Sequence, residues 1–407
     1  MSGKRQNDVV DIEALRARAR DALAPVEPAG PPQSSEEART LMLSSRTDGG
    51  RQVPSYYLLY FLLVDLLGFP KTGQWEKVAW TVPIRYQGRL YAVEHRKLGV
   101  GIFAPNLDSS ASMSGRPTAA QEEDAREIAR CLRSAVEVAE PYFEWRAQQA
   151  VKGTQLNVVN RNKWLFERYE YFRGRYSELR GEAKAKGDTK RVTKEDLDDG
   201  THLTSVQFPF WGLYQDAEWT AQAAIEAFFS WTEHAFIHLA LLQGRLQTGE
   251  DVARLANSNW KEKVKAALDL QNEVTKSYYD TLLELRYQVR NFMAHGAFGK
   301  SGEAFSFHSG AGAVPVLLTG ARHDRYSFTG KAAFDEDAAL ETIEGFLEHL
   351  WSGNTRPARQ YLFSDLPIIL TYVENGKYSR AMRSEGEMAT LVEWLTQKFD
   401  DAENMDW

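Results

Sequence analysis

The residues best suited to chemistry lie in one short segment, RNFMAHG, which runs from Arg290 to Gly296. Arginine is permanently charged, and its planar fork of donors matches the oxygens of a phosphate group. Histidine titrates near neutral pH, so His295 can take up or release a proton during a reaction. Asn291 follows the arginine and can orient a neighbour or donate a hydrogen bond to a ligand. The segment therefore predicts a site for a phosphate-bearing substrate.

An amphipathic helix has to position these residues. The pattern predicts a helix from Val274 to His295, and the next residue, a glycine, suits the left-handed conformation that ends many helices. There the helix dipole favours a protonated histidine by about 0.3 to 1 kcal/mol. Arg290 and His295 point about 140° apart on the helix, so they would line opposite walls of a groove formed with another helix or a second subunit. The apolar face comprises Tyr278, Leu282, Leu285, Val289 and Phe292 or Met293.

Such a groove fits the cleavage of RNA without a metal ion. That reaction requires a base for the 2′-hydroxyl proton, an acid for the leaving 5′-oxygen and positive charge for the crowded phosphorus. Arg290 can supply the charge, and His295 can supply either proton transfer but not conveniently both at once. A second copy of the site across a twofold axis would supply the other. We therefore expect a metal-independent endoribonuclease that acts as a homodimer and needs no cofactor.

RNFMAHG in the third of four predicted helices resembles the HEPN superfamily, whose signature is arginine, a polar residue that is often asparagine, three variable residues and histidine. The resemblance covers about residues 205–360. It implies an all-α bundle, dimers that join two motifs, metal-independent endoribonuclease activity, and roles in antiviral defence and toxin–antitoxin systems. A regulatory protein or antitoxin is then an expected partner. Carried over to this chain, Arg290 and His295 are the catalytic pair and Asn291 is the polar neighbour.

Two other interpretations of the segment stay open. An arginine five positions before a histidine arises readily by chance in a chain with eight histidines. The arginine could be structural, with the histidine capping the helix. Alternatively, the same basic groove could bind RNA or a nucleotide without cleaving it, in a non-catalytic dimerisation or sensor module.

The helix predicted from Gln215 to Gly244 carries further candidates. We expect Glu233 or His234 to face the groove as a supporting partner of the catalytic residues. His238 stands four positions after His234, but the residue directly after the first histidine is alanine rather than the glutamate of zinc metalloproteases. We therefore expect no metal site and interpret His238 as a hydrogen-bonded histidine of the core.

Residues 151–204 are predicted to comprise a basic helix rich in aromatic residues and, at the end of the segment, a linker or exposed loop. Its aromatic rings could stack on bases while its charges hold phosphates. They could also pack on the helical bundle and leave the charges in solvent, which is the interpretation we favour, although one face could serve each purpose. The candidate RNA-binding residues are Arg286, Lys163, Arg168, Arg173 and Arg175.

Composition limits the other possibilities. The formal net charge of −7 argues against a surface covered with phosphate-binding groups, so any contact with RNA must be local. The single cysteine, Cys131, excludes an internal disulfide and fits a reducing, cytoplasmic compartment. The most apolar run has 14 residues and starts at Tyr56. It is shorter than the roughly 20 residues that cross a bilayer, so we expect no membrane association.

These patterns predict a mainly α protein of two domains, because 407 residues exceed the usual size of one core. Residues 1–51, rich in Pro, Gly and Ser, are predicted to be a flexible N-terminal arm. Residues 52–150 are predicted to form a smaller α+β domain of unknown role, with an apolar helix, two or three antiparallel strands and one long amphipathic helix. Residues 205–407 are predicted to be a HEPN-like helical domain, a four-helix bundle with a small inserted β-hairpin. Its predicted elements are Gln215–Gly244, Val252–Leu270, Val274–His295 and Asp335–Trp351, with the hairpin at Ala304–Phe328.

Overall fold

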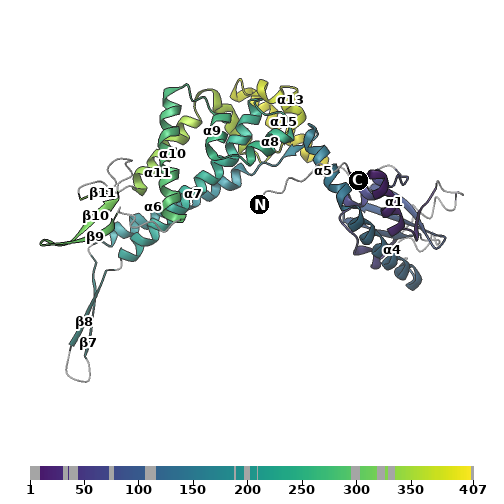
Figure 1. Ribbon diagram of the computed structural model, residues 1–407, viewed down its shortest axis with the longest axis horizontal. Helices are drawn as coiled ribbons and strands as arrows, with labels where there is room; N and C mark the ends of the chain where they lie inside the picture. The colour runs from purple at the N-terminus through teal and green to yellow at the C-terminus, as the bar shows by residue number, and fades with distance from the viewer. Residues whose placement is uncertain are drawn as a thin grey trace. The chain divides into compact units, whose positions relative to one another are not determined.

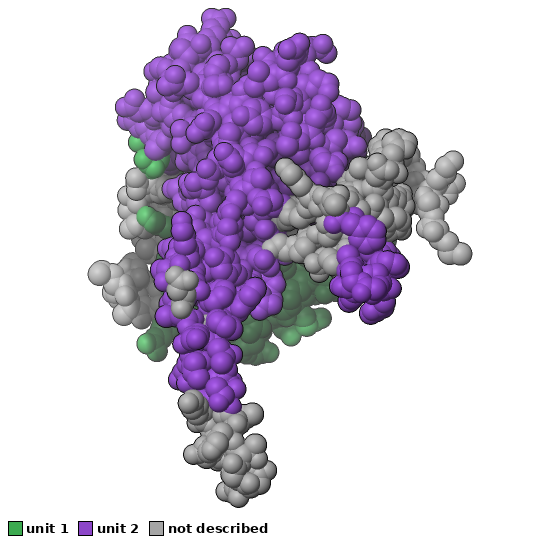
Figure 2. Space-filling model, turned by 90° about the vertical axis from the view of Figure 1, so that its left-hand side faces the viewer, with its two compact units in different colours: residues 1–150, 400–407 green, residues 151–399 purple. Residues whose placement is uncertain are grey.

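The protein was analysed as a computed structural model that describes residues 10–30, 35, 45–72, 78–105, 116–187, 189–196, 202–208, 210–294, 303–318, 326–328 and 335–404. The described chain is mainly helical, with a smaller share of β-strand (Figure 1). It divides into two compact units, one of residues 1–150 with 400–407 and one of residues 151–399 (Figure 2). Each unit has its own hydrophobic core.

The first unit contains a five-stranded antiparallel sheet in the order β1-β3-β4-β5-β2. Its three central strands are those expected from the sequence. Gln87 and Gly88 join β3 to β4 with φ angles of 50° and 75°, which are the positive values that a tight type I′ hairpin requires. The strands are β1 (Val26–Pro28), β2 (Ser45–Arg46), β3 (Val78–Tyr86), β4 (Arg89–Arg96) and β5 (Gly99–Ala104).

The prediction of a flexible arm over residues 1–51 is wrong for its described part. Residues Ile12–Ala22 form helix α1, which packs against α4 and buries Leu15 and Ala19 in the core of the first unit. Arg20 donates a hydrogen bond to the carbonyl of Leu67, and β1 and β2 are the two edge strands of the sheet. The prolines and glycines of this region separate short elements that tertiary contacts hold in place.

The other helices of the first unit follow the predicted apolar and amphipathic segments, with two differences. The apolar run continues from α-helix into a π-helical turn, and the long amphipathic helix is interrupted at Ala139, two residues before Pro141. Proline cannot donate the backbone hydrogen bond that an uninterrupted helix would need. These elements are the 3₁₀ turn η1 (Gly49–Arg51), α3 (Tyr56–Tyr60), η2 (Phe61–Leu66), α4 (Ala119–Val138) and α5 (Glu140–Lys152).

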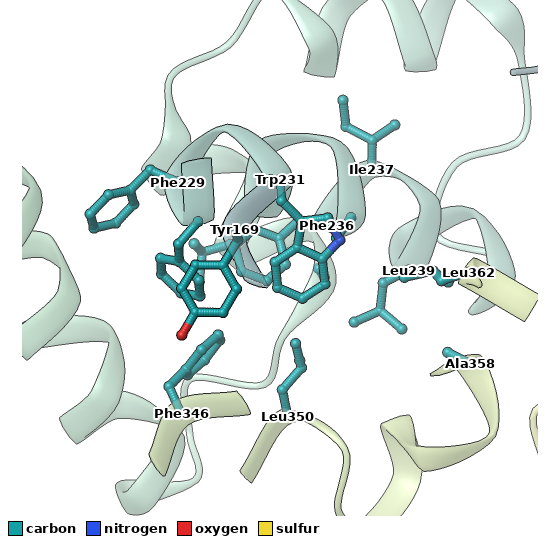
Figure 3. Packing of buried hydrophobic residues seen from close by; sticks show 14 of the residues in the cluster. Tyr169, Phe229, Trp231, Phe236, Ile237, Leu239, Phe346, Leu350, Ala358 and Leu362 are labelled. Atoms are coloured by element: carbon teal, nitrogen blue, oxygen red, sulfur yellow. The ribbon is translucent and has the colours of Figure 1, made fainter. Parts of the chain in front are cut away.

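The second unit is built on α6 (Asn162–Ala185) and α7 (Phe210–Leu242), which lie side by side (Figure 1). Aromatic rings fill the space between them and α11 (Glu336–Leu350): Tyr169 packs on Phe228, and Phe228 packs on Phe346. Figure 3 shows Tyr169, Trp231 and Phe346 in this core. Because α6 shares this core, residues 151–204 are not a separate segment but part of the same unit as α7.

Of the four helices predicted for the C-terminal domain, three are continuous in the structure. The one predicted from Val252 to Leu270 is divided into α8 (Gly249–Ala256) and α9 (Trp260–Ala267). Asn259 separates them because its side chain accepts a hydrogen bond from the backbone of Glu262 and so starts a new helix. α10 (Glu273–Ala294) and α11 complete the predicted set. Further helices follow in η3 (Gly353–Thr355), α12 (Arg356–Leu362), α13 (Leu370–Glu374), α14 (Lys377–Ala381) and α15 (Glu385–Asn404).

Strands in the second unit occur as small sheets. The insertion before α11 has three strands rather than a simple hairpin, and a second hairpin occupies the region expected to be a linker. β6 and β12 form a short pair between segments that are about 200 residues apart in sequence. The strands are β6 (Asn157–Val158), β7 (Arg191–Asp196), β8 (His202–Gln207), β9 (Glu303–Ser309), β10 (Gly312–Leu318), β11 (Tyr326–Ser327) and β12 (Ile368–Ile369).

Candidate functional site

Helix α10 carries the start of the RNFMAHG segment. Its backbone is helical from Glu273 to Ala294, so Arg290 and Asn291 lie in its last turns. The side chains of these two residues, and His295 altogether, lie outside the described residues. The proposed catalytic geometry is therefore a prediction, whereas the helix that leads into it is a structural result.

The apolar face predicted for this helix is confirmed where it is described. Leu282, Leu285 and Val289 are buried in the core of the second unit, at the spacing of three and four residues that one helix face requires. Tyr278 is half-buried and packs its ring against Phe346 of α11. These contacts fix the orientation of α10 about its own axis as far as Val289, one residue before Arg290.

A three-residue ion network joins α10 to the neighbouring helices. Arg286 donates to Glu233 of α7 at 2.5 Å, and Lys263 of α9 donates to the other carboxylate oxygen at 2.8 Å. The guanidinium of Arg286 also lies over the rings of Phe229 and Trp260, at 5.5 and 5.7 Å from their centres. Glu233 therefore faces α10, one helical turn before Arg290.

The electrostatics of this network hold Glu233 in its charged form. Burial by itself would raise the pKa of its carboxyl, but the hydrogen bonds and charges of Lys263 and Arg286 outweigh it, so the pKa is lowered. Arg286, which we expected to bind RNA, has one terminal nitrogen on Glu233 and the other, Nη1, buried without a hydrogen-bond partner in the described part of the chain. In the structure Arg286 holds α10 against α7 through its ion pair with Glu233.

His234 does not share this position. It is rotated by about 100° from Glu233 on α7, and its Nε2 accepts a hydrogen bond from the backbone nitrogen of Arg161 at 3.0 Å. Burial lowers its pKa to about 3, with repulsion from His238 and Arg161 adding to the effect. His234 is a neutral acceptor that holds the start of α6, and its place beside the groove stays a prediction.

His238 is a buried histidine of the core, as the sequence suggested. Its two ring nitrogens lie 3.0 Å from the carbonyl oxygen of His234 and 3.2 Å from that of Val159. Burial lowers its pKa to about 4, although the two carbonyl contacts act in the opposite direction. The ring is therefore neutral at pH 7, and it links α7 to the segment that precedes α6.

The basic residues of α6 do not form a single stripe. Lys163 lies 3.5 Å from Asp365, Arg173 pairs with Glu344 of α11, and Arg175 pairs with Glu178 one turn further along α6. Arg168 has its Nε buried without a partner in the described part of the chain. The structure thus joins three of these four candidates to separate carboxylates and leaves the role of all four in RNA binding a prediction.

The aromatic residues of α6 divide between the core and the surface. Tyr169 and Tyr176 are buried, which confirms the favoured interpretation of an aromatic face packed on the bundle. Trp164 and Tyr171 keep 60% and 68% of their surface exposed. These two rings remain available to stack on a base.

Sequence reasoning missed two residues that hold this region. Lys263 has only 4% of its surface exposed, and the available signal was its position on the same face of α9 as Trp260 and Val264. Asn160 is buried just before α6, and its amide donates to the carbonyls of Tyr361, Leu362 and Leu366 at 3.1 to 3.2 Å. Nothing in the local sequence indicates that contact, because its partners are about 200 residues away.

Comparison of the chain with protein-family models, curated proteins and solved structures found no match. Among the described residues, no helix is long and apolar enough to cross a membrane. The same residues include no group of three or more histidines, cysteines and carboxylates that could hold a metal ion. The assignment of a function therefore depends on the chain's own residues.

Proposed function

We propose that this protein is a metal-independent endoribonuclease with a HEPN-like C-terminal domain, in which Arg290, Asn291 and His295 of two subunits form a composite site. The observation that carries the proposal is the course of α10, which is helical from Glu273 to Ala294, the last described residue before position 303. Arg290 and Asn291 occupy its last turns and His295 follows directly. In the proposed site the helix ends beside His295, where the unpaired carbonyls of a last helical turn favour a protonated imidazole.

The ion network supports the proposal, because a nuclease site needs rigid elements beneath it. Arg286 lies one turn before Arg290 and is held by Glu233, which Lys263 holds in turn. This network fixes the rotation of α10 about its own axis. That rotation decides the direction in which Arg290 projects. Glu233 is accordingly a positioning residue in the proposed site.

The proposed reaction needs no metal ion, because the side chains supply both proton transfers and the positive charge. One histidine takes the proton of the 2′-hydroxyl while the 2′-oxygen forms a bond to phosphorus, and Arg290 stabilises the added negative charge. The bond from phosphorus to the 5′-oxygen breaks, and the histidine of the second subunit protonates that oxygen. The products are a 2′,3′-cyclic phosphate and a 5′-hydroxyl. In this proposal the activity serves antiviral defence or a toxin role, and a regulatory protein or antitoxin restrains it.

The test is cleavage of tRNA and total RNA by the purified protein in excess EDTA. We expect fragments with 2′,3′-cyclic phosphate ends, and a loss of at least about a hundredfold in rate for Arg290→Ala and for His295→Ala, as for the removal of a general acid or base. Arg254→Ala and His308→Ala are the matched controls, because both side chains are exposed and lie outside the RNFMAHG segment. Light scattering should give twice the 46.2 kDa mass of one chain.

The outcomes separate this proposal from its rival. Intact RNA in every condition, or equal cleavage by the Arg290→Ala and His295→Ala variants, contradicts it. Tight binding of RNA without cleavage, insensitive to His295→Gln, would support the non-catalytic sensor module instead. A mass of one chain at micromolar concentration would remove the second histidine from the mechanism.

A further inference from the structure

The first unit contains a cavity of about 1160 Å³ that is lined with arginines. It lies between η1 and β2 on one side and helix α4 on the other, and α4 is labelled in Figure 1. Its volume is somewhat above the range for small-molecule sites, about 300 to 1000 Å³. The charged lining residues are Arg46, Asp48, Arg116, Glu122, Arg126, Glu127, Arg130 and Arg133.

Three of the arginines project from a single face of α4. Arg126, Arg130 and Arg133 are spaced by four and three residues, so their side chains lie one above another along the helix. Arg46 comes from β2, and Arg116 lies two residues before the N-cap Thr118. Segments far apart in the chain thus bring five guanidinium groups to one cavity.

The three carboxylates of the lining are already occupied. Glu122 accepts hydrogen bonds from the backbone nitrogens of Asp48 and Gly49, at 3.0 and 2.7 Å. Asp48 pairs with Arg51 at 2.9 Å, and Glu127 pairs with Arg130 at the same distance. Five arginines against three carboxylates leave the lining with a formal excess of two positive charges.

Two of the arginines are bonded to neutral groups. Arg46 donates to the carbonyls of Leu98 and Val100 at 3.2 and 2.7 Å, and Arg133 donates to the carbonyl of Gln52. Neither has a carboxylate partner within the described part of the chain. Burial lowers the pKa of Arg46, and repulsion from Arg51 and Arg96 lowers it further, as expected where positive charge is in excess.

The two remaining arginines with carboxylate partners, Arg126 and Arg130, can exchange these partners for a ligand with little loss of stability. Arg126 pairs with Glu123 and Arg130 with Glu127, each within one turn of α4, and more than half of both arginine side chains is exposed. Exposed pairs within one helix contribute little to stability. A phosphate group offers each guanidinium a bidentate partner of higher charge.

We propose that this cavity binds a small ligand that carries several linked phosphates, and that it recognises the phosphates rather than a base. None of the described residues that line it is aromatic, so the walls offer no surface on which a nucleobase could stack. Five arginines around one cavity match a chain of phosphates such as that of a nucleoside triphosphate or inorganic triphosphate. This inference concerns residues 45–133 and does not depend on the proposed nuclease site.

The test is titration calorimetry of the full chain with inorganic triphosphate and with ATP, both in EDTA. We expect saturable binding of the two ligands with dissociation constants within about threefold of each other, because the shared phosphates supply the contacts. Raising the salt from 50 to 300 mM should weaken both equally. Arg126→Gln with Arg130→Gln should weaken binding at least about thirtyfold, since hydrogen bonds to charged groups are the strong ones.

The matched control is Arg18→Gln, which removes an exposed arginine of α1 outside the cavity and should leave binding unchanged. Arg130→Lys keeps the charge without the planar fork, and an intermediate affinity is expected if the protein is folded by circular dichroism. Absence of binding at 1 mM ligand overturns the proposal. ATP binding without triphosphate binding, an equal loss in Arg18→Gln, or binding of a single-stranded RNA that triphosphate cannot displace overturns it as well.

Discussion

Replacing Glu233 by glutamine tests the ion network beneath the proposed site. The substitution keeps the size of the side chain and removes the negative charge that Arg286 and Lys263 share. Lys263 then keeps a buried ammonium group, with 5% of its side chain exposed, and no counterion at hydrogen-bond distance among the residues that the structure describes. Breaking a fully buried pair destabilises a protein by about 3 to 5 kcal/mol. Because 35% of the Glu233 side chain is exposed and water screens part of the interaction, we expect about 2 to 3 kcal/mol.

A double-mutant cycle identifies the cause of that loss. In the Glu233→Gln background, Lys263→Met removes the unpaired buried charge, so it should restore part of the lost stability. In the wild type the same substitution removes a paired charge and should destabilise. We expect an interaction energy of about 1 to 2 kcal/mol between the two positions.

The assay is urea unfolding followed by tryptophan fluorescence, with the free energy of unfolding taken by linear extrapolation. Glu226→Gln is the control, because Glu226 is exposed on the same helix and its replacement should change stability by less than about 0.5 kcal/mol. If Glu233→Gln changes stability no more than this control, the network does not hold these helices together. If Lys263→Met has the same effect in both backgrounds, Glu233 and Lys263 are not coupled.

Two further predictions concern the segment before α6. Burial lowers the pKa of His234 to about 3 and that of His238 to about 4. Unfolded histidines titrate near 6.5, so below that pH the unfolded chain gains protons that the folded chain does not, and lowering the pH from 7 to 5 should reduce stability by about 2 kcal/mol per histidine. The glutamine of His234→Gln can still accept a hydrogen bond from the backbone of Arg161, and this variant should lose about half of the decrease in the free energy of unfolding between pH 7 and pH 5. The measurement is urea unfolding at the two pH values, and an unchanged decrease would contradict the prediction. Asn160→Ala leaves three buried carbonyls without their donor and should lower the free energy of unfolding by about 2 to 3 kcal/mol. The control Asn257→Ala, at an exposed position, should change it by less than about 0.5 kcal/mol. Equal effects in both variants would show that the buried amide is not needed.

The elements that the sequence predicted well are those whose apolar residues follow one clear period. α10 begins within one residue of its predicted start because Leu282, Leu285 and Val289 mark a single face. α11 begins after Asp335, whose side chain caps it by accepting from Ala338. Both signals are local, so they can be found without the rest of the fold.

The features that were missed depend on contacts between distant residues. α1 looked like part of an arm because its two buried residues, Leu15 and Ala19, stand among charged ones. β7 and β8 are short and have exposed side chains where these are described, so they lack the apolar alternation that marks a strand. His234 faces the start of α6 rather than α10, and only the packing of three helices decides that orientation.

The pairing of β6 with β12 has a consequence for synthesis of the chain. Val158 pairs with Ile368, and Asn160 bonds to carbonyls at positions 361 to 366, so the beginning of the second unit is completed by residues near its end. Closing so long a loop is slow, and domains of a nascent chain fold from the N-terminal side first. A ribosome will therefore have released most of residues 159–360 before the second unit can close, while the core formed by residues 10–150 can already be complete. Any activity that depends on the closed second unit then begins only after translation of the whole bundle.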